Sequence, residues 1–275
     1  MKAVLLGLLA ETSLHCGAGT DGGLVDLPVA REAATDYPYI PGSSLKGALR
    51  QWAVEAGLGT SECSRIFGEQ ESAGGILVAD ARLLLLPVRS LSSAYKWLTC
   101  PHLLERLNRD CIRASLAAIA PDVTVTQGEY VGTPSDGLPL FLEERQFTHS
   151  KNANLNDVAQ PLSGLLPDGM THAPTRNRLA TQLVVLNNED FVWFARNGLP
   201  INARNILDDE KKTSKNLWYE ETLPPDTLLY TLVFERLEGT LDRIRSLLTS
   251  SPYIQVGGNE TVGMGWLATR LIDAP

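Results

Sequence analysis

The sequence predicts an α+β fold with a ferredoxin-like, or RRM-like, core that carries insertions in its middle. Strand, helix and strand patterns follow one another between residues 2 and 88, and the same order recurs between residues 227 and 272. Two such units separated by a long stretch are typical of a split βαβ core. We therefore expect one domain, 1–275, with a helical and loop insertion at 92–175 and a further insertion at 201–222.

Composition places the chain among globular proteins with an acidic surface. Hydrophobic residues make up 44% of the 275 residues, which excludes a disordered chain. Lys and Arg number 24 against 32 Asp and Glu, a net charge of -8. This balance argues against a polycation that coats nucleic acid, so any contact with nucleic acid must come from a local basic face. The four cysteines form no Cys-x-x-Cys pair, which argues against a zinc knuckle or a disulfide framework.

Residues 2–13 form the first predicted strand. They are apolar on both faces, as in a strand at the centre of a sheet. This start resembles a signal peptide, but Glu11 ends the apolar stretch and no small-residue cleavage site follows. No stretch approaches the roughly 20 apolar residues of a membrane helix. We expect a cytoplasmic protein without a membrane partner.

A glycine-rich loop and a single acid follow this strand. Four glycines lie between Gly17 and Gly23, which predicts an exposed loop rather than a helix or a regular strand. Asp26 then stands alone among apolar neighbours, and by itself it reads as a turn or cap acid. His15 precedes the loop, and a lone histidine in such a place is more often structural than catalytic.

The next predicted element is a helix over 43–56, with Ser43 or Ser44 as its cap. Its apolar residues recur at helical spacing on one face. Lys46 and Arg50 are four residues apart and share another face near the helix start. Amide N–H groups and the helix dipole favour phosphate at such a place. The helix is therefore a candidate for contact with a nucleic-acid backbone.

The remaining elements follow from periodicity and from turn residues. The predicted strands are 76–88, 227–237, 253–256 and 264–272, and the predicted helices are 93–119, 176–186, 188–197 and 240–250. Thr240 is the expected cap of the last helix, and residues 183–186 fit a strand equally well. Residues 120–175 are rich in Gly, Pro, Asn, Asp, Ser and Thr, which predicts a set of long loops.

A second glycine-rich segment lies near the C-terminus. Gly258 and Gly263 have the spacing of a phosphate-binding P-loop, but Met264 stands where that loop needs lysine. The segment is therefore not an NTPase loop. Two interpretations remain: a hairpin turn that needs positive φ, or a backbone surface against which a polymer lies close to the main chain.

Four segments together resemble a known family. They are HCGAGTDGGLVDLPVARE (His15–Glu32), YIPGSSLKGALR (Tyr39–Arg50), NARNILDDEKKTSKNLWYEETLPPDTLLY (Asn202–Tyr230) and VGGNETVGMGW (Val256–Trp266). They resemble the backbone subunit of type III-B (Cmr) CRISPR effector complexes, a Cas7-like protein of the RAMP superfamily. The resemblance spans nearly the whole chain. One departure is visible: the family loop often carries Gly-hydrophobic-Gly at both ends, and here only Gly263-Met264-Gly265 keeps that form, whereas Gly257-Gly258 does not.

The resemblance implies a ferredoxin-like palm with fingers and a β-hairpin thumb at 201–222. It implies that copies of the chain stack head to tail along a guide RNA with other Cmr subunits. They cut complementary single-stranded target RNA at regular intervals with Mg²⁺ or another divalent cation. Asp26, in the VDLP motif, maps onto the catalytic and metal-binding position. The expected RNA-binding residues are His15, Gly17, Gly19, Ser43, Ser44, Lys46, Arg50, Lys215, Trp218, Tyr219, Glu221, Gly257, Gly258, Gly263 and Gly265.

RNA cleavage asks little of the protein when the 2′-OH of the substrate attacks the neighbouring phosphate. A thumb that flips a nucleotide can bring that hydroxyl in line with the leaving oxygen. An aspartate side chain in a model peptide has a pKa of about 3.9 and is a weak base, which favours orientation of the 2′-OH or metal binding as the role of Asp26. We expect a composite site, with Asp26 from one copy and Lys215, Trp218, Tyr219 or Glu221 from the neighbour's thumb. In the alternative, Trp218 and Tyr219 only anchor the hairpin on its own palm.

Other functions remain open on the sequence alone. The first alternative is a non-catalytic scaffold that binds guide RNA while another subunit cuts. A guide-processing ribonuclease of the same superfamily is less favoured, because no clear pair of catalytic histidines is visible. A role outside RNA biology is compatible with the bare composition.

Overall fold

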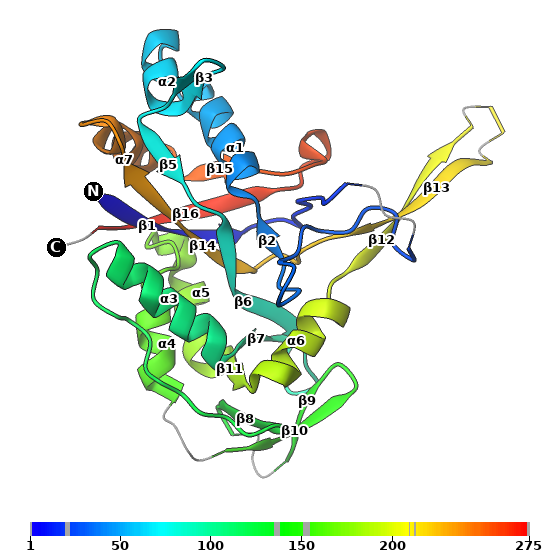
Figure 1. The fold of residues 1–275 in the computed structure, drawn as a ribbon. Coiled ribbons are helices and arrows are strands. Elements are labelled where there is room, and N and C mark those ends of the chain that lie inside the picture. The colour runs from blue at the N-terminus through cyan, green and yellow to red at the C-terminus, as the bar shows by residue number, and fades with distance from the viewer. Residues whose placement is uncertain are drawn as a thin grey trace.

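A large mixed β-sheet organises the chain in the computed structural model, which describes residues 2–19, 23–134, 138–150, 155–208, 210–211 and 213–273 (Figure 1). Its strands run in the order β15-β16-β1-β14-β6-β7-β11-β8-β10-β9, with β2 on β6 and β5 on β14. Neighbours are antiparallel except β8 with β10 and β7 with β11. The strands are β1 (Ala3–Ala10), β2 (Tyr39–Ile40), β5 (Ile76–Val78), β6 (Ala81–Arg89), β7 (Tyr95–Thr99), β8 (Glu129–Gly132), β9 (Leu140–Leu142), β10 (Arg145–His149), β11 (Leu183–Leu186), β14 (Leu228–Glu235), β15 (Tyr253–Gln255) and β16 (Trp266–Asp273).

Helices cover both faces of this sheet. They are α1 (Gly42–Glu55), α2 (Thr60–Phe67), α3 (Pro101–Arg113), α4 (Leu155–Ser163), α5 (Ala173–Gln182), α6 (Asn188–Asn197) and α7 (Thr240–Ser250), with short 3-10 turns η1 (Met170–His172) and η2 (Glu260–Val262). In Figure 1, α1, α2 and α7 lie above β1, and α3, α4 and α5 lie below it. None of the described helices has the length and apolar character needed to span a membrane.

Strand β1 lies at the centre of the molecule, as its apolar sequence predicts. It pairs with β14 on one side and with β16 on the other, and all eight of its residues are buried. Side chains alternate along a strand. Val4 and Leu6 therefore enter the core shared with α1 and α7, whereas Leu5 and Leu9 enter the core shared with α3, α4 and α5. The prediction of a central first strand is confirmed.

The structure corrects the predicted helix over 93–119. Residues Tyr95–Thr99 form β7, with Trp97 fully buried, and the helix α3 begins only at Pro101. Cys100, immediately before the proline, has extended φ and ψ of -147° and 163°. A residue before proline is disfavoured in the helical region, and proline suits the first helical position, so Pro101 separates the two elements.

Other departures are local. Helix α2 was not expected, and the predicted strand 76–88 divides into β5 and β6. The predicted loops of 120–175 contain β8, β9, β10, α4 and η1, because short strands add to the far edge of the sheet. Residues 176–186 comprise most of α5 and then strand β11, the second of the two options weighed for 183–186.

Neither predicted helix cap is made by the expected residue. Pro41 occupies the N-cap position of α1, and the amide of Gly42 donates to Asp80 Oδ1 at 2.7 Å. Ser43 and Ser44 thus lie exposed in the first turn without capping. Gly239, with φ of 79°, precedes α7, and Thr240 instead donates its hydroxyl to the carbonyls of Gly75 and Leu237.

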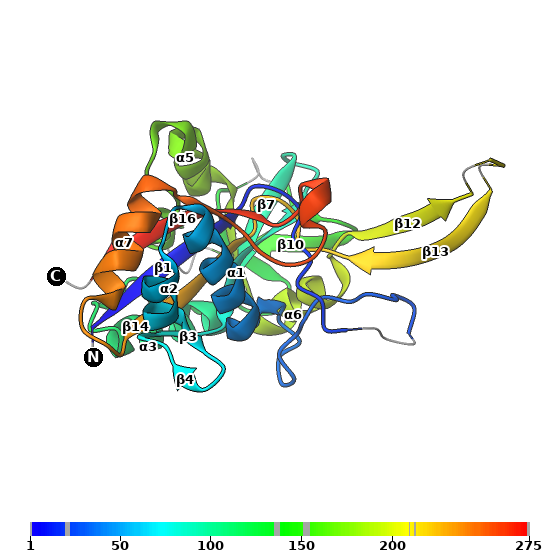
Figure 2. The ribbon, with the colours of Figure 1, turned by 90° about the horizontal axis from the view of Figure 1, so that it is seen from above.

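A long two-stranded hairpin projects from the body of the protein (Figure 2). It consists of β12 (Ile201–Leu207) and β13 (Ser214–Glu221), paired antiparallel within the predicted segment 201–222. Successive side chains of a strand point to opposite faces. Leu217 and Tyr219 therefore lie on one face of the ribbon, and Trp218 and Glu220 lie on the other. A second, small hairpin joins β3 (Gly68–Glu69) to β4 (Ser72–Ala73).

Candidate RNA interface

The segment that contains Asp26 lies against the root of the long hairpin. The Leu27 amide donates to Tyr219 O at 3.1 Å, and the Glu221 amide donates to Leu27 O at 3.0 Å. Leu27 precedes Pro28, and the proline ring favours an extended backbone at the residue before it. This conformation suits the short parallel pairing of Leu27 with Glu220. Asp26 Oδ2 accepts the Tyr219 amide hydrogen at 2.8 Å. Asp26 is exposed, and its Oδ1 has no partner among the described residues.

Glu221 fixes the other end of the same segment. Its Oε2 accepts the Val29 amide at 3.1 Å, and its Oε1 accepts Arg31 Nη2 at 2.7 Å. The side chain is 7% exposed. Glu221 was expected to touch RNA, but both of its carboxylate oxygens are occupied inside the chain. The geometry makes it a residue that positions the Asp26 segment.

Glu220 ties the hairpin root to the two glycine-rich segments. It is 1% exposed, and it receives Arg204 Nε at 3.1 Å and the amide group of Asn259. His15 Nδ1 lies 3.7 Å from Glu220 Oε1 and 2.8 Å from the backbone carbonyl of Glu221. Because a carbonyl oxygen only accepts, the geometry assigns the proton of the ring to Nδ1. Nε2 of His15 is then the ring nitrogen left for other contacts.

A surface hollow gathers residues that the sequence places far apart. It is lined by His15, Cys16, Gly17, Ser44, Gly47, Ala48, Gln51, Gly257, Gly258 and Glu260. The Gly258 amide donates to His15 O at 2.8 Å, so the two glycine-rich segments pack directly on each other. Gly257 has φ of 92°, and a Cβ there would lie 2.3 Å from His15 O. Five predicted RNA-binding residues therefore meet beside the N-terminal half of α1.

Lys46 and Arg50 lie outside this hollow, on the side of α1 that faces the β3–β4 hairpin. Arg50 Nη1 donates to Gly68 O at 2.8 Å. Partial burial lowers the pKa of the Lys46 amine, and the positive charges of Arg236 and Arg50 lower it further. The expected basic face is therefore present, and it includes an arginine from the end of β14 that was not anticipated.

The other predicted residues are dispersed. Gly19, Gly263 and Gly265 have φ between 82° and 101°, and a Cβ at Gly265 would lie 2.1 Å from Val256 O. These glycines are thus needed for turns, as one of the two interpretations of the C-terminal segment holds. Lys215 pairs with Asp208 at 3.2 Å, toward the tip of the hairpin.

Trp218 and Tyr219 differ in their surroundings. Trp218 is half-buried and lies opposite Arg204 across the ribbon, whereas Tyr219 is 43% exposed. Tyr219 and Glu221 were expected to approach Asp26 from a neighbouring copy. Within one chain, the Tyr219 amide and Glu221 lie beside Asp26, because the Asp26 segment pairs with β13; a contribution from a neighbouring copy stays a prediction.

The donor set around Asp26 does not form a metal centre by itself. Among the described residues, no group of three or more His, Cys, Asp or Glu side chains is placed to hold a metal ion. Asp26 offers one unpartnered carboxylate oxygen, and the neighbouring acids Glu220 and Glu221 are committed to internal partners. The four cysteines are buried and unpaired.

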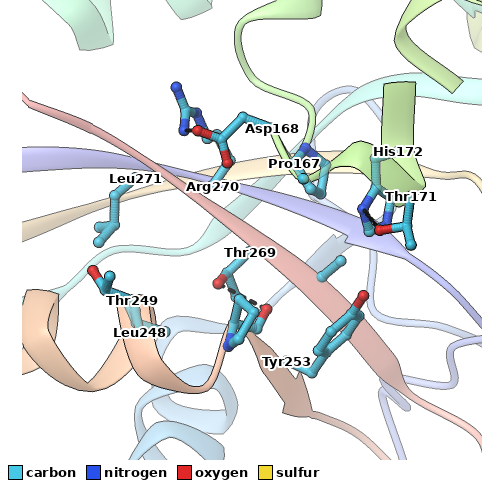
Figure 3. A pocket seen from close by; sticks show the side chains of 13 residues that line it. Pro167, Asp168, Thr171, His172, Leu248, Thr249, Tyr253, Thr269, Arg270 and Leu271 are labelled. Atoms are coloured by element: carbon cyan, nitrogen blue, oxygen red, sulfur yellow. Dashed lines mark hydrogen bonds and ion pairs between the residues drawn. The ribbon is translucent and has the colours of Figure 1, made fainter. Parts of the chain in front are cut away.

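A second hollow lies on another side of the molecule, where α7, β15 and β16 meet the segment between α4 and α5 (Figure 3). Its polar side chains have partners within the chain, since Arg270 pairs with Asp168 and His172 Nε2 lies 2.6 Å from Glu11 Oε1. None of the residues predicted to bind RNA lines it. The candidate interface is therefore the hollow between the glycine-rich segments and α1, with the root of the long hairpin.

Sequence reasoning missed several residues that build this interface. Arg31 and Glu220 contact groups far away in the sequence, and Arg204 reaches Glu220 across the hairpin; no local pattern signals these contacts. Asn259 could have been found, because an Asn after two glycines is a signal for positive φ. Its φ is 62°, and its side chain reaches Glu220.

Comparison with known proteins decides the family. The sequence model of the RAMP superfamily matches residues 8–268. The chain belongs to the RAMP superfamily. A curated relative of this RAMP protein, the CRISPR system Cmr endoribonuclease Cmr4 of Pyrococcus furiosus, is 32% identical over 98% of the chain and 96% of its own length. The family resemblance drawn from the sequence motifs is confirmed.

Solved structures give the same assignment for this RAMP protein. The crystal structure of oligomeric Cmr4 from Pyrococcus furiosus superposes with a TM-score of 0.80 at 26% identity, and the match covers 100% of this chain and 99% of the other. A cryo-EM structure of type III-B Cmr-beta bound to cognate target RNA contains a chain that matches at 20% identity with a TM-score of 0.74. That match covers 98% of this chain and 97% of the other, and it supports the fold.

Proposed function

We propose that this RAMP protein is the backbone subunit of a type III-B CRISPR effector complex and cleaves target RNA within it. The full-length similarity to a protein named as the Cmr endoribonuclease supports this function. Its partners are a guide RNA, a complementary single-stranded target RNA, further copies of itself and other Cmr subunits, in the cytoplasm. The solved structure of oligomeric Cmr4 supports self-association.

The parts of the fold receive family roles in this proposal. The ferredoxin-like palm consists of β1, α1, β5, β14, α7 and β16. The strand order β16-β1-β14-β5 supports it, as does the burial of α1 and α7 on one face of β1. The insertion 92–175 provides the fingers, and β12 with β13 provides the thumb. The projection of that hairpin from the body supports the thumb assignment.

One observation carries the catalytic part. Asp26 is held by the Tyr219 amide through Oδ2, while Oδ1 has no partner among the described residues. One oxygen is thus oriented, and the other is available to a ligand beside the hollow that we assign to RNA. An exposed carboxylate with no internal ion pair contributes little to folding, which favours a role in binding or chemistry.

The reaction we propose is attack by the 2′-OH of the target RNA on the adjacent phosphorus. Asp26 Oδ1 accepts a hydrogen bond from that hydroxyl and holds it in line with the leaving 5′ oxygen. The new O2′–P bond forms as the P–O5′ bond breaks. The proton of the 2′-OH passes to solvent water and water protonates the leaving O5′, so the products are a 2′,3′-cyclic phosphate and a 5′-hydroxyl. We assign Asp26 to orientation of the attacking hydroxyl, since the Tyr219 amide fixes the carboxylate through Oδ2 and leaves Oδ1 as an acceptor.

The cation remains a separate part of the proposal. Mg²⁺ is commonly bound by one or two carboxylates together with phosphate oxygens and waters. Any divalent cation at Asp26 therefore takes its other ligands from the RNA and from water, because the described residues form no group of three or more ligands. No step of the proposed reaction depends on this cation.

A cleavage assay tests the function. Complex is reconstituted with guide RNA and supplied with complementary RNA, with and without Mg²⁺. Asp26→Asn should abolish cutting while assembly and RNA binding remain near wild type, because Asn keeps an acceptor for the Tyr219 amide but replaces the free carboxylate oxygen with an NH₂ donor. Asp242→Asn, at an exposed pair with Arg245 on α7, is the matched control. Cutting by Asp26→Asn at the wild-type rate would leave the non-catalytic scaffold as the function.

A further inference from the structure

Two arginines from distant parts of the chain are anchored at the same small hairpin. Arg50 of α1 donates from Nη1 to Gly68 O at 2.8 Å, and Arg236, just after β14, donates from Nη1 to Gly74 O at 3.0 Å. The two carbonyls flank the β3–β4 hairpin, and its backbone is closely packed. A Cβ at Gly68 would lie 2.6 Å from the Gly74 amide. Both guanidinium groups are therefore fixed by rigid backbone.

Lys46 lies four residues before Arg50 on α1 and shares its side of the helix. It is half-buried on α1, and Arg236 and Arg50 are the charges that act on it. No ion pair joins Lys46, Arg50 or Arg236 to a carboxylate within the described residues. Other cations in this region have partners within the chain: Arg243 pairs with Glu62 at 3.0 Å, Lys2 lies 4.0 Å from Glu235, and Arg65 donates to the Glu238 carbonyl at 2.6 Å. In the part of the chain that the structure describes, three like charges thus lie near one another with no ion pair to a carboxylate.

Each guanidinium retains donors for a ligand. Arginine has five N–H groups, and the anchoring bond to a carbonyl occupies one nitrogen. Planar pairs of such donors match the oxygens of a phosphate. The ammonium of Lys46 and the guanidinium groups of Arg50 and Arg236 together therefore suit an anion with several consecutive phosphates.

The position of the three cations connects them with the RNA hollow. Gly47 lines the hollow, and Arg50 follows three residues later on α1. At about 100° per residue, the two positions are about 60° apart around the helix axis. A strand that leaves the hollow across the exposed side of α1 reaches Arg50 first, and then Lys46 and Arg236.

We propose that Arg236 is an RNA-binding residue and completes, with Lys46 and Arg50, a site for consecutive phosphates of single-stranded RNA. This proposal rests on the proposed function, since it extends the guide-binding face of α1 to the end of β14. Binding is independent of base sequence, because the three side chains offer only phosphate donors. The negative charge of the RNA supplies a counter-charge for the three cations.

The test measures RNA affinity of the full-length chain as a function of salt. A labelled single-stranded RNA of guide length is titrated with wild type, Arg236→Gln, Arg236→Lys, Arg50→Gln and Arg243→Gln. The logarithm of the RNA association constant K falls linearly with the logarithm of the salt concentration. For single strands, each lost phosphate contact makes this fall less steep by about 0.7. Arg236→Gln and Arg50→Gln should each lose about one such contact and bind more weakly. Arg236→Lys should keep most of the slope, and Arg243→Gln should match wild type.

The outcomes separate this site from the proposed function. If Arg236→Gln keeps the wild-type affinity and slope while Arg50→Gln loses a contact, Arg236 is not part of the site. Equal loss in Arg236→Lys and Arg236→Gln would mean that the bond to Gly74, rather than the charge, is responsible, and would overturn the proposal. Weaker association between copies of the Arg236→Gln chain, with an unchanged salt slope for RNA binding, would also overturn the proposal. In each of these cases, loss of cutting in Asp26→Asn complexes would still support the function.

Discussion

The carboxylate of Asp26 and the backbone amide of Tyr219 are joined by a hydrogen bond of 2.8 Å within one chain. This contact places the candidate catalytic acid on the root of the long hairpin, although 193 positions separate the two residues. Orientation of Asp26 therefore depends on the register between its segment and β13. A shift of one residue would move Asp26 away from the Tyr219 amide.

Amide exchange of Tyr219 should report this contact. Asp26→Asn retains an acceptor, so the Tyr219 amide should exchange as slowly as in wild type. Asp26→Ala removes the acceptor, and exchange should accelerate about tenfold if the bond contributes about 1.4 kcal/mol. Hydrogen exchange followed by NMR or mass spectrometry measures it. Equal exchange in Asp26→Ala and wild type would show that the contact does not persist in solution.

Glu221→Gln should destabilise the fold and reduce cutting together. The substitution weakens the bond to Arg31 and turns one acceptor for the Arg31 and Val29 groups into a donor. Loss of a charge-assisted hydrogen bond costs about 1.5–3 kcal/mol. Urea unfolding measures the loss, and Glu55→Gln, whose side chain is exposed on α1, should change it little. A full loss of cutting at unchanged stability would instead indicate direct contact of Glu221 with RNA.

The long hairpin should divide into a protected root and an exchanging tip. Glu220, Glu221, Thr222 and Leu223 are buried at the root, whereas residues 203–207 and 214–217 are mostly exposed. An isolated two-stranded ribbon is marginally stable in water. Amides at 220–223 should therefore exchange slowly in the free chain, and amides of the tip should be protected only in the RNA complex. Slow exchange along the whole free hairpin would contradict this expectation.

Gly47→Ala should raise stability and lower RNA affinity. Gly47 is exposed within α1, and a Cβ there would touch nothing within 4 Å. Replacing glycine by alanine inside a helix stabilises it by about 1 kcal/mol. The same methyl group enters the hollow that we assign to RNA. Thermal unfolding and RNA titration measure the two effects, with Val54→Ala, exposed on α1 but outside the hollow, as the control. Unchanged affinity would remove the hollow from the interface.

Local patterns in the sequence were enough for much of the core. The unbroken apolar run of β1 predicts a central strand, and the periodicity of Leu45, Leu49 and Trp52 predicts α1. The helical spacing of Trp97 with Leu103 and Leu107 is a coincidence across an element boundary. Pro101 marks that boundary, and the propensity of Tyr95–Thr99 for a strand was the signal that should have prevailed.

The site was predictable only where residue type carries information by itself. Glycine-rich segments and the Asp26 motif pointed to His15, Gly17, Gly257 and Gly258, and the structure brings these together. The contacts of Glu220 with His15 and Asn259, by contrast, join the root of the hairpin to two segments that are distant in the sequence. The packing of Arg236 beside Lys46 likewise depends on where β14 ends against α1. Neither relationship leaves a mark in the neighbouring sequence.

Lys46 carries a positive charge that is unfavourable in the free protein. Partial burial lowers the pKa of its amine in the folded state, and Arg236 and Arg50 lower it further. Because the folded chain releases this proton at lower pH than the unfolded chain does, the Lys46 contribution to stability rises with pH between the two pKa values.

Lys46→Met should flatten that rise in stability with pH. It should also stabilise the free protein at neutral pH by about 0.2–0.5 kcal/mol, the usual cost of a like-charge pair four residues apart on a helix. The same variant should bind RNA more weakly, because a phosphate no longer finds its partner. Urea unfolding at neutral and alkaline pH and RNA titration measure the opposed effects, and a variant that loses both stability and affinity would show that Lys46 is structural.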